Sequence, residues 1–135
     1  MNTKNITTQG VHHVGLTVPD LDQTLTFFVD VLNYNLLGKR EEYPAAFISD
    51  GVTMITLWQA GKLAVEFDRT RNIGLHHLAI SIKDTDSLAE LHQQLQNTTN
   101  VTIEFTPQLQ GAGNNTHMMC NIPGGIRVEF IAPTA

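Results

Sequence analysis

The feature that most constrains this chain is a segment that occurs twice, 64 residues apart (position 76 minus position 12). Val11–Asp20 reads VHHVGLTVPD, and Leu75–Asp84 reads LHHLAISIKD. Each copy opens with a His-His pair, continues with apolar residues at every second position and closes on aspartate. This alternation predicts a β-strand with one apolar face. Because four of the six histidines lie in these two pairs, we expect the chain to consist of two related halves.

The alternation also sorts the histidines by face, because successive side chains of a strand point to opposite sides. His13 and His77 are predicted to share the face of small residues, which no helix covers. His12 and His76 are predicted to lie on the helix-facing side, in a packing or hydrogen-bonding role.

Each repeat continues with the signals of a helix and three short strands. Asp20 and Asp84 are suited to cap helix N-termini, and leucines and phenylalanines then recur at helical spacing. The further predicted strands cover residues 34–40, 45–49 and 54–58 in the first half, and 101–105, 116–121 and 126–131 in the second. The sequence therefore predicts an α+β fold of two repeated βαβββ modules that form a cupped mixed sheet with helices on the outside. The modules, about 10–60 and 74–133, would be joined by a connector at 60–73 in a single domain of residues 1–135.

Composition excludes several classes of partner. The net charge is −5, from 8 Lys+Arg and 13 Asp+Glu, and no basic stripe occurs, so we expect no nucleic-acid partner. No segment approaches the ~20 apolar residues of a membrane span, so we expect no membrane association. Cys120 is the only cysteine and Met1–Gly10 is polar, which favours a cytoplasmic protein.

A possible metal site emerges from the predicted strand faces. In the last strand, Val128 and Phe130 are apolar, so Glu129 lies on the opposite face together with Arg127. A carboxylate within an apolar strand requires a partner. With His13 and His77 on the equivalent face of the two opening strands, Glu129 completes two imidazoles and a carboxylate, a donor set that suits a divalent metal.

These same segments resemble a known family. HHVGLTVPDLDQTLTFFVDVLNYNLLG, HHLAISIKD and PGGIRVEF are similar, in this order and spacing, to motifs of the vicinal oxygen chelate superfamily, which includes glyoxalase I, extradiol dioxygenases, fosfomycin-resistance enzymes and bleomycin-binding proteins. The resemblance implies paired βαβββ modules around one divalent ion (Zn, Mn, Ni, Co or Fe), usually in a homodimer. It places the metal ligands at His13, His77 and Glu129.

One position departs from the pattern of glyoxalase I. That enzyme has a fourth ligand, Glu or Gln, on the last strand of its first module, and alignment of MITLW with RVEFI places Thr56 there. Gln59 falls on the opposite face. Because threonine is a poor ligand for a divalent metal, standard glyoxalase I activity is not expected.

Three functions remain open from the sequence. The leading hypothesis is a metal-dependent, glyoxalase-like enzyme (lyase, isomerase or transferase type) whose metal acts as a Lewis acid on a small substrate with adjacent oxygens. Glu129 would also be catalytic by moving protons. An Fe(II) extradiol-type dioxygenase, which would need a further His and Tyr, and a non-catalytic drug-binding protein are the alternatives. The candidate substrate-binding residues are Thr56, Trp58, His117 and Arg127.

Overall fold

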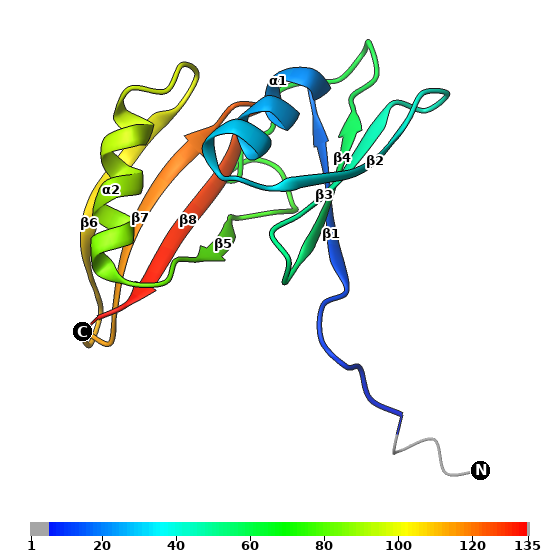
Figure 1. Cartoon of the computed structure of the whole chain (residues 1–135). Helices are drawn as coiled ribbons and strands as arrows, with labels where there is room; N and C mark the ends of the chain where they lie inside the picture. Colours follow the sequence, from blue (N-terminus) through cyan, green and yellow to red (C-terminus); the bar gives the residue numbers. More distant parts are fainter. Residues whose placement is uncertain (1–5, 135) are drawn as a thin grey trace.

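The computed structural model describes residues 6–134 and contains two mixed four-stranded sheets, each associated with a helix (Figure 1). Sheet A is built from β1 (His13–Val18), β2 (Asn35–Arg40), β3 (Ala45–Ser49) and β4 (Met54–Gln59). Sheet B is built from β5 (Leu78–Ser81), β6 (Thr102–Gln110), β7 (Asn115–Ile122) and β8 (Ile126–Pro133). The helices are α1 (Leu21–Thr26), its continuation η2 (Phe27–Val31) and α2 (Thr85–Gln96). The predicted α+β fold of two βαβββ modules is confirmed.

The two sheets share one topology. Their strand orders are β1-β4-β3-β2 and β5-β8-β7-β6, with the opening strand parallel to the closing strand in each. The register is also repeated, since Gly15 pairs with Thr56 and Ala79 pairs with Glu129. Gly15 and Ala79 each lie two residues after the second histidine of their pair, so Thr56 and Glu129 occupy equivalent positions.

The helices begin where the sequence predicts and end in different ways. Asp20 accepts a hydrogen bond from the Gln23 backbone N–H at 3.1 Å, and Asp84 accepts one from Ser87 at 2.8 Å. The first helix then widens into a π-turn, η2. A π-turn adds a residue to the turn, and the adjacent Phe27 and Phe28 are both buried there.

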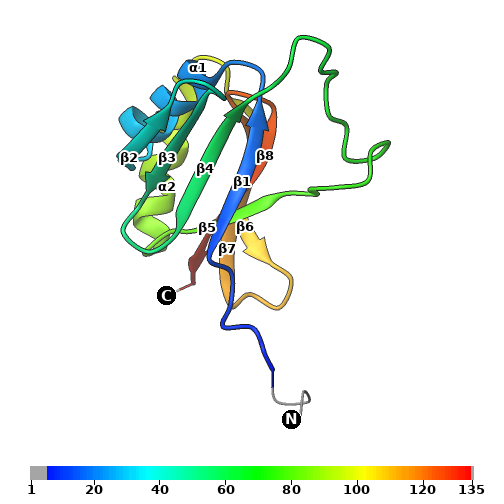
Figure 2. The same ribbon diagram turned by 90° about the vertical axis from the view of Figure 1, so that its right-hand side faces the viewer.

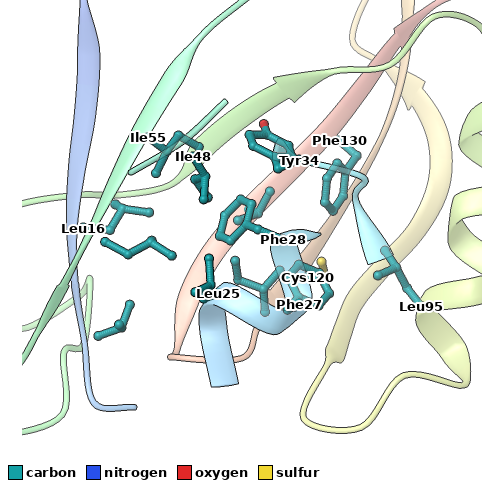
Figure 3. Packing of buried hydrophobic residues seen from close by; sticks show 14 of the residues in the cluster. Leu16, Leu25, Phe27, Phe28, Tyr34, Ile48, Ile55, Leu95, Cys120 and Phe130 are labelled. Carbon is teal, nitrogen blue, oxygen red and sulfur yellow. The ribbon is translucent and has the colours of Figure 1, made fainter. Parts of the chain in front are cut away.

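One hydrophobic core joins the two modules. It takes apolar residues from the helix-covered faces of both sheets, and Figure 3 shows Phe28 and Phe27 of η2 lying between Leu16 and Ile48 of sheet A and Phe130 of sheet B. The Thr24 hydroxyl adds a buried hydrogen bond to the Pro123 carbonyl at 2.9 Å. Because the helix-covered faces are joined in this core, the helix-free face of each sheet lies on the outside of the chain.

The segment between the modules follows neither sheet. Residues 60–77 form no helix or strand, and Figure 2 shows this segment looping away from the sheets before it reaches β5. Leu63, Val65 and Ile73 expose almost their whole side chains. Among residues 6–134, no helix is long and apolar enough to cross a membrane.

Candidate metal and substrate site

Sheet B gathers three predicted site residues on its helix-free face. Glu129 of β8 is only 6% exposed. Its Oε1 lies 3.6 Å from Nε2 of His77, just before β5, and its Oε2 lies 2.5 Å from Nδ1 of His117 on β7. Since a carboxylate only accepts hydrogen bonds, His117 is the donor in this contact. One buried carboxylate therefore meets a separate imidazole at each oxygen.

One further polar residue contacts the Glu129 carboxylate and was not predicted from the sequence. Gln110, at the end of β6, donates from Nε2 to Glu129 Oε2 at 3.5 Å. Strand β6 changes register twice against β7, so simple alternation cannot assign the faces of its residues. The polar character of Gln110 is the only signal that the sequence offers.

Sheet A presents a different surface at the equivalent position. Thr56 is buried on the helix-free face, and its hydroxyl accepts a hydrogen bond from the Trp58 indole at 2.9 Å. Gly15 allows this close arrangement, because a Cβ there would lie 3.1 Å from the Thr56 hydroxyl and 3.5 Å from the indole nitrogen. Gln59 lies on the other face, as predicted, where its side chain accepts from the Leu21 backbone N–H.

Aromatic side chains extend the surface around Trp58. The ring centroids of Tyr43 and Phe47 lie 5.4 and 6.1 Å from that of Trp58, both edge to face. The Arg40 guanidinium lies 5.7 Å from the Phe47 centroid, within the range of a cation–π contact. The helix-free face of sheet A is thus mainly aromatic, whereas that of sheet B carries carboxylate and imidazole groups.

Arg127 and Glu104 form an ion pair on sheet B. The guanidinium donates twice, from Nε at 3.0 Å and from Nη2 at 2.6 Å. The paired guanidinium lowers the pKa of the Glu104 carboxyl below its ordinary value. Of the predicted substrate-binding residues, Arg127 is therefore already engaged by a carboxylate of its own chain.

For His12 and His76 the predicted helix-facing position is wrong, and the predicted hydrogen-bonding role is confirmed. Both side chains are exposed and neither enters the helix layer. Instead, Nδ1 of His12 lies 2.9 Å from Nδ1 of His13, and Nδ1 of His76 lies 2.7 Å from Nδ1 of His77. The predicted alternation does not apply because β1 begins only at His13 and β5 only at Leu78, so the first histidine of each pair precedes the strand.

His13 stands apart from the cluster on sheet B. It is exposed at the start of β1. Within the described part of the chain, no three His, Cys, Asp or Glu side chains are arranged to hold one metal ion. A single copy therefore brings together His77, His117 and Glu129 and leaves His13 on the other sheet.

The two tyrosines also occupy different environments. Tyr34 is buried against Phe28, with ring centroids 5.1 Å apart, and burial raises its pKa to about 12. Tyr43 is exposed beside Trp58. Only Tyr43 is thus placed near a predicted site residue.

A surface hollow of about 640 Å³ lies elsewhere, between the first helix and the loop after α2. Its lining includes Asp20, Asp30, Thr98, Asn100 and Pro123. None of the predicted site residues lines it, so we do not associate it with the candidate metal site.

Comparison with known proteins identifies relatives that share this architecture. The family model described as Glyoxalase/Bleomycin resistance protein/Dioxygenase superfamily matches residues 10–130. A lactoylglutathione lyase from Haemophilus influenzae is 30% identical over 132 residues, covering 88% of this chain and 89% of that protein. A 2-epi-5-epi-valiolone epimerase from Actinomyces sp. is 31% identical over 101 residues, covering 59% of this chain. The match spans 55%, about half, of the epimerase's own length.

Solved structures show the same fold. A glyoxylase/bleomycin resistance protein/dioxygenase domain from Frankia sp. EAN1pec has a TM-score of 0.81 at 24% identity, covering 94% of this chain and 93% of that chain. A lactoylglutathione lyase from Agrobacterium tumefaciens has a TM-score of 0.71 at 17% identity, covering 93% and 94%. At these identities the likeness concerns the fold alone.

Proposed function

Because this chain belongs to the Glyoxalase/Bleomycin resistance protein/Dioxygenase superfamily, we propose that it is a metal-dependent enzyme acting on a small substrate with adjacent oxygen atoms. The observation that carries the proposal is the pairing of His77 with the buried Glu129 on a helix-free sheet face. In this proposal His13 of a second copy supplies the third ligand, and the enzyme is a homodimer. A cytoplasmic location is part of the proposal and is favoured by the single free cysteine.

The two donors on sheet B fit a divalent ion. The distance from His77 Nε2 to Glu129 Oε1 is 3.6 Å. Two ligands of a tetrahedral ion, each about 2.1 Å from the metal, lie ~3.4 Å apart. The 3.6 Å separation is also too long for a direct hydrogen bond, so the facing atoms remain open to a shared ion. Neutral imidazole and carboxylate suit Zn, Mn, Ni, Co and Fe alike.

The need for a second copy follows from the placement of His13. The core joins the helix-covered faces of the two sheets, so the helix-free faces remain open to another chain. The connector supports this arrangement, since Leu63 and Val65 project from it and are 96% and 87% exposed. Together with Phe67 and Ile73, which are also exposed, these side chains give the connector an apolar character that a partner chain would cover.

The residues around the site suggest how a reaction would proceed. When bound, the metal would act as a Lewis acid that polarises substrate oxygens. Glu129 Oε1, when not held by the metal, would accept a proton from a substrate carbon or oxygen, while the His117 Nδ1–H at Oε2 stabilises the charged carboxylate. Sheet A of the second copy would contribute Thr56 and Trp58. These side chains would form the wall that excludes water from the substrate.

The type of reaction is constrained by Thr56. This residue occupies the place equivalent to Glu129 and already shares its hydroxyl with the Trp58 indole. It therefore leaves a three-ligand site, with room for two substrate oxygens. We propose a lyase, isomerase or transferase reaction of the glyoxalase type. We do not expect the specific reaction that lactoylglutathione lyase catalyses.

An Fe(II) dioxygenase is the second candidate, and one contact favours it. Such an enzyme needs an additional histidine near the metal, and His117 lies 2.5 Å from Glu129. The tyrosine it would also need must be Tyr43, because Tyr34 is buried in the core. Elemental analysis of protein purified without chelators separates the candidates: stoichiometric iron favours the dioxygenase, and zinc, manganese, nickel or cobalt favours the Lewis-acid enzyme.

Complementation between two variants tests the shared site. Chains carrying His13→Ala and chains carrying Glu129→Ala are each expected to bind no stoichiometric metal. If each site takes His13 from one chain and Glu129 from the other, a mixed dimer regains one intact site. An equal mixture should then recover about one quarter of the wild-type metal content, as random pairing in a twofold dimer requires.

Light scattering and a control pair complete this test. The wild-type chain should have the mass of a dimer at micromolar concentration. A mixture of His77→Ala and Glu129→Ala chains should recover no metal, because both ligands come from the same sheet. A monomeric wild-type protein, or a failure of the first mixture to recover metal after refolding together, would refute the shared site.

A further inference from the structure

We propose that His12 and His76 are positioning residues that fix the orientation and tautomer of the neighbouring His13 and His77. This inference rests on the proposed metal site. It is carried by a contact that occurs independently in both modules: the paired Nδ1 atoms lie 2.9 Å apart in the first and 2.7 Å apart in the second.

The ring geometry is also repeated. The ring centroids lie 5.1 Å apart with an interplanar angle of 83° in the His12–His13 pair. They lie 5.0 Å apart at 70° in the His76–His77 pair. The same arrangement is therefore built at the equivalent position of each module.

A short Nδ1 to Nδ1 contact allows only one hydrogen between the two atoms. One ring must donate and the other must accept, because neutral imidazole carries one N–H. If His77 carries its hydrogen on Nδ1, its Nε2 presents a lone pair, and this is the atom that faces Glu129 Oε1. A metal ligand must present a free lone pair, so the accepting ring is assigned to His76.

The same reasoning applies to His13. Its Nδ1 is engaged by His12, which leaves Nε2 to face a second copy. Histidine ligands of metals commonly donate their other N–H to a fixed acceptor, which orients the ring and raises its basicity. Here the acceptor is the preceding residue in the chain, at both halves of the proposed site.

Packing does not account for these contacts. His12 and His76 are exposed and lie outside the hydrophobic core. Their side chains contribute little to the folded state, and their replacement should leave the fold intact. A loss of metal affinity after such a replacement would therefore reflect the state of the neighbouring ring.

The tautomer can be measured directly in metal-free protein. Long-range proton–nitrogen NMR spectra of protein labelled with ¹⁵N-histidine distinguish Nδ1–H from Nε2–H rings. We expect His13 and His77 to carry the hydrogen on Nδ1 in the wild-type protein. His76→Leu should shift His77 toward the Nε2–H form and leave His13 unchanged, which provides an internal control. His12→Leu should do the reverse.

Metal affinity provides the second measurement. By calorimetric titration with Zn²⁺, His76→Leu should weaken binding about 10- to 100-fold. His76→Asn keeps an acceptor oxygen near the position of Nδ1 and should retain affinity within about threefold, which tests rescue by a matched acceptor.

The tautomer measurement and the Zn²⁺ titration together distinguish failure of the positioning role from failure of the proposed metal site. An Nε2–H form of His77 in metal-free wild-type protein, or equal Zn²⁺ affinities of the His76→Leu and wild-type proteins, overturns the positioning role. A wild-type protein that shows the Nδ1–H form and binds no Zn²⁺ refutes the proposed metal site and leaves the positioning of the rings supported.

Discussion

The helix-free faces of the two sheets follow one backbone plan and present opposite chemistry. At the same register position, sheet A has a threonine hydroxyl bonded to an indole, and sheet B has a carboxylate between two imidazoles. The residues that pair with them, Gly15 and Ala79, are both small. The repeated backbone thus fixes where a side chain points, and the residue type alone decides whether that place can bind a metal.

This difference assigns separate roles to the two faces. Sheet B holds the carboxylates of the candidate site, Glu129 and Glu104, and the second of these forms an ion pair with Arg127. Sheet A holds His13 and the aromatic side chains around Trp58. If two copies bring the faces together, one face supplies most of the metal ligands and the other supplies one histidine and the apolar wall.

Truncation of the two equivalent side chains, Glu129 and Thr56, tests whether the two faces have different roles. Glu129→Ala should reduce metal affinity by more than about 100-fold, because it removes a charged ligand. Thr56→Ala should leave metal affinity within about twofold and cost about 1 kcal/mol of stability for the lost hydrogen bond. Calorimetric titration and thermal unfolding measure the two effects, and similar metal affinities in both variants would contradict the assignment of roles.

The fold was predictable because it rests on patterns that are local and repeated. The spacing of the His-His pairs, the apolar alternation and the aspartate caps define β1, β5, α1 and α2 before any long-range contact is known. The π-turn at η2 was not predicted, since its hydrogen bonds depend on how Phe27 and Phe28 pack between the sheets. A left-handed Asn33, with φ of 60°, follows this turn and precedes β2.

The site was predictable only in part. Strand alternation correctly places Glu129 and Thr56 on the helix-free faces, because β8 and β4 are regular. It fails for His12 and His76, which precede their strands, and for Gln110, which follows two register shifts. The metal ligation of His13, His77 and Glu129 stays a prediction, since one copy of the chain places His13 on sheet A, apart from His77 and Glu129 on sheet B.

A second test concerns the contact between the two modules, where Thr24 of α1 meets the turn at Pro123 and Gly124 of sheet B. Gly124 has φ of +107°, and a Cβ there would lie 2.7 Å from the Thr24 hydroxyl and 3.2 Å from Val18. Gly124→Ala should cost about 2–4 kcal/mol through backbone strain and loss of the bond from Thr24 to Pro123. Gly125→Ala, at φ of +77° with open space around its Cβ, is the matched control and should cost only about 1 kcal/mol of strain. Urea unfolding measures both, and equal losses would show that the contact with Thr24 contributes nothing.

A third variant would make the two faces more alike. Thr56→Glu places a carboxylate at the position equivalent to Glu129 and should tighten metal binding about tenfold, a gain of about 1.4 kcal/mol. It also removes the acceptor of the Trp58 indole. Trp58 is the only tryptophan, so its fluorescence should change when metal is added to the variant. Unchanged affinity together with unchanged fluorescence would show that position 56 does not face the metal, and Thr56→Leu, which offers no ligand atom, serves as the control.

The smallest expected effect concerns the ion pair that distinguishes sheet B. The hydrogen bonds from Arg127 hold the pKa of Glu104 below its ordinary value of 4.5. A carboxyl whose pKa is lowered on folding stabilises the protein above its unfolded-state pKa, and this contribution is lost as the pH falls through the folded-state value. Because Glu104 is partly exposed, Glu104→Gln should cost only about 0.5 kcal/mol near neutral pH. The difference from the wild-type protein should shrink as the pH is lowered below 4.5, when measured by urea unfolding at several pH values. Glu90→Gln, an exposed substitution on α2, serves as the control for removal of a surface carboxylate. A difference for Glu104→Gln that stays constant down to the lowest pH would mean that the side chain acts through packing rather than through its charge.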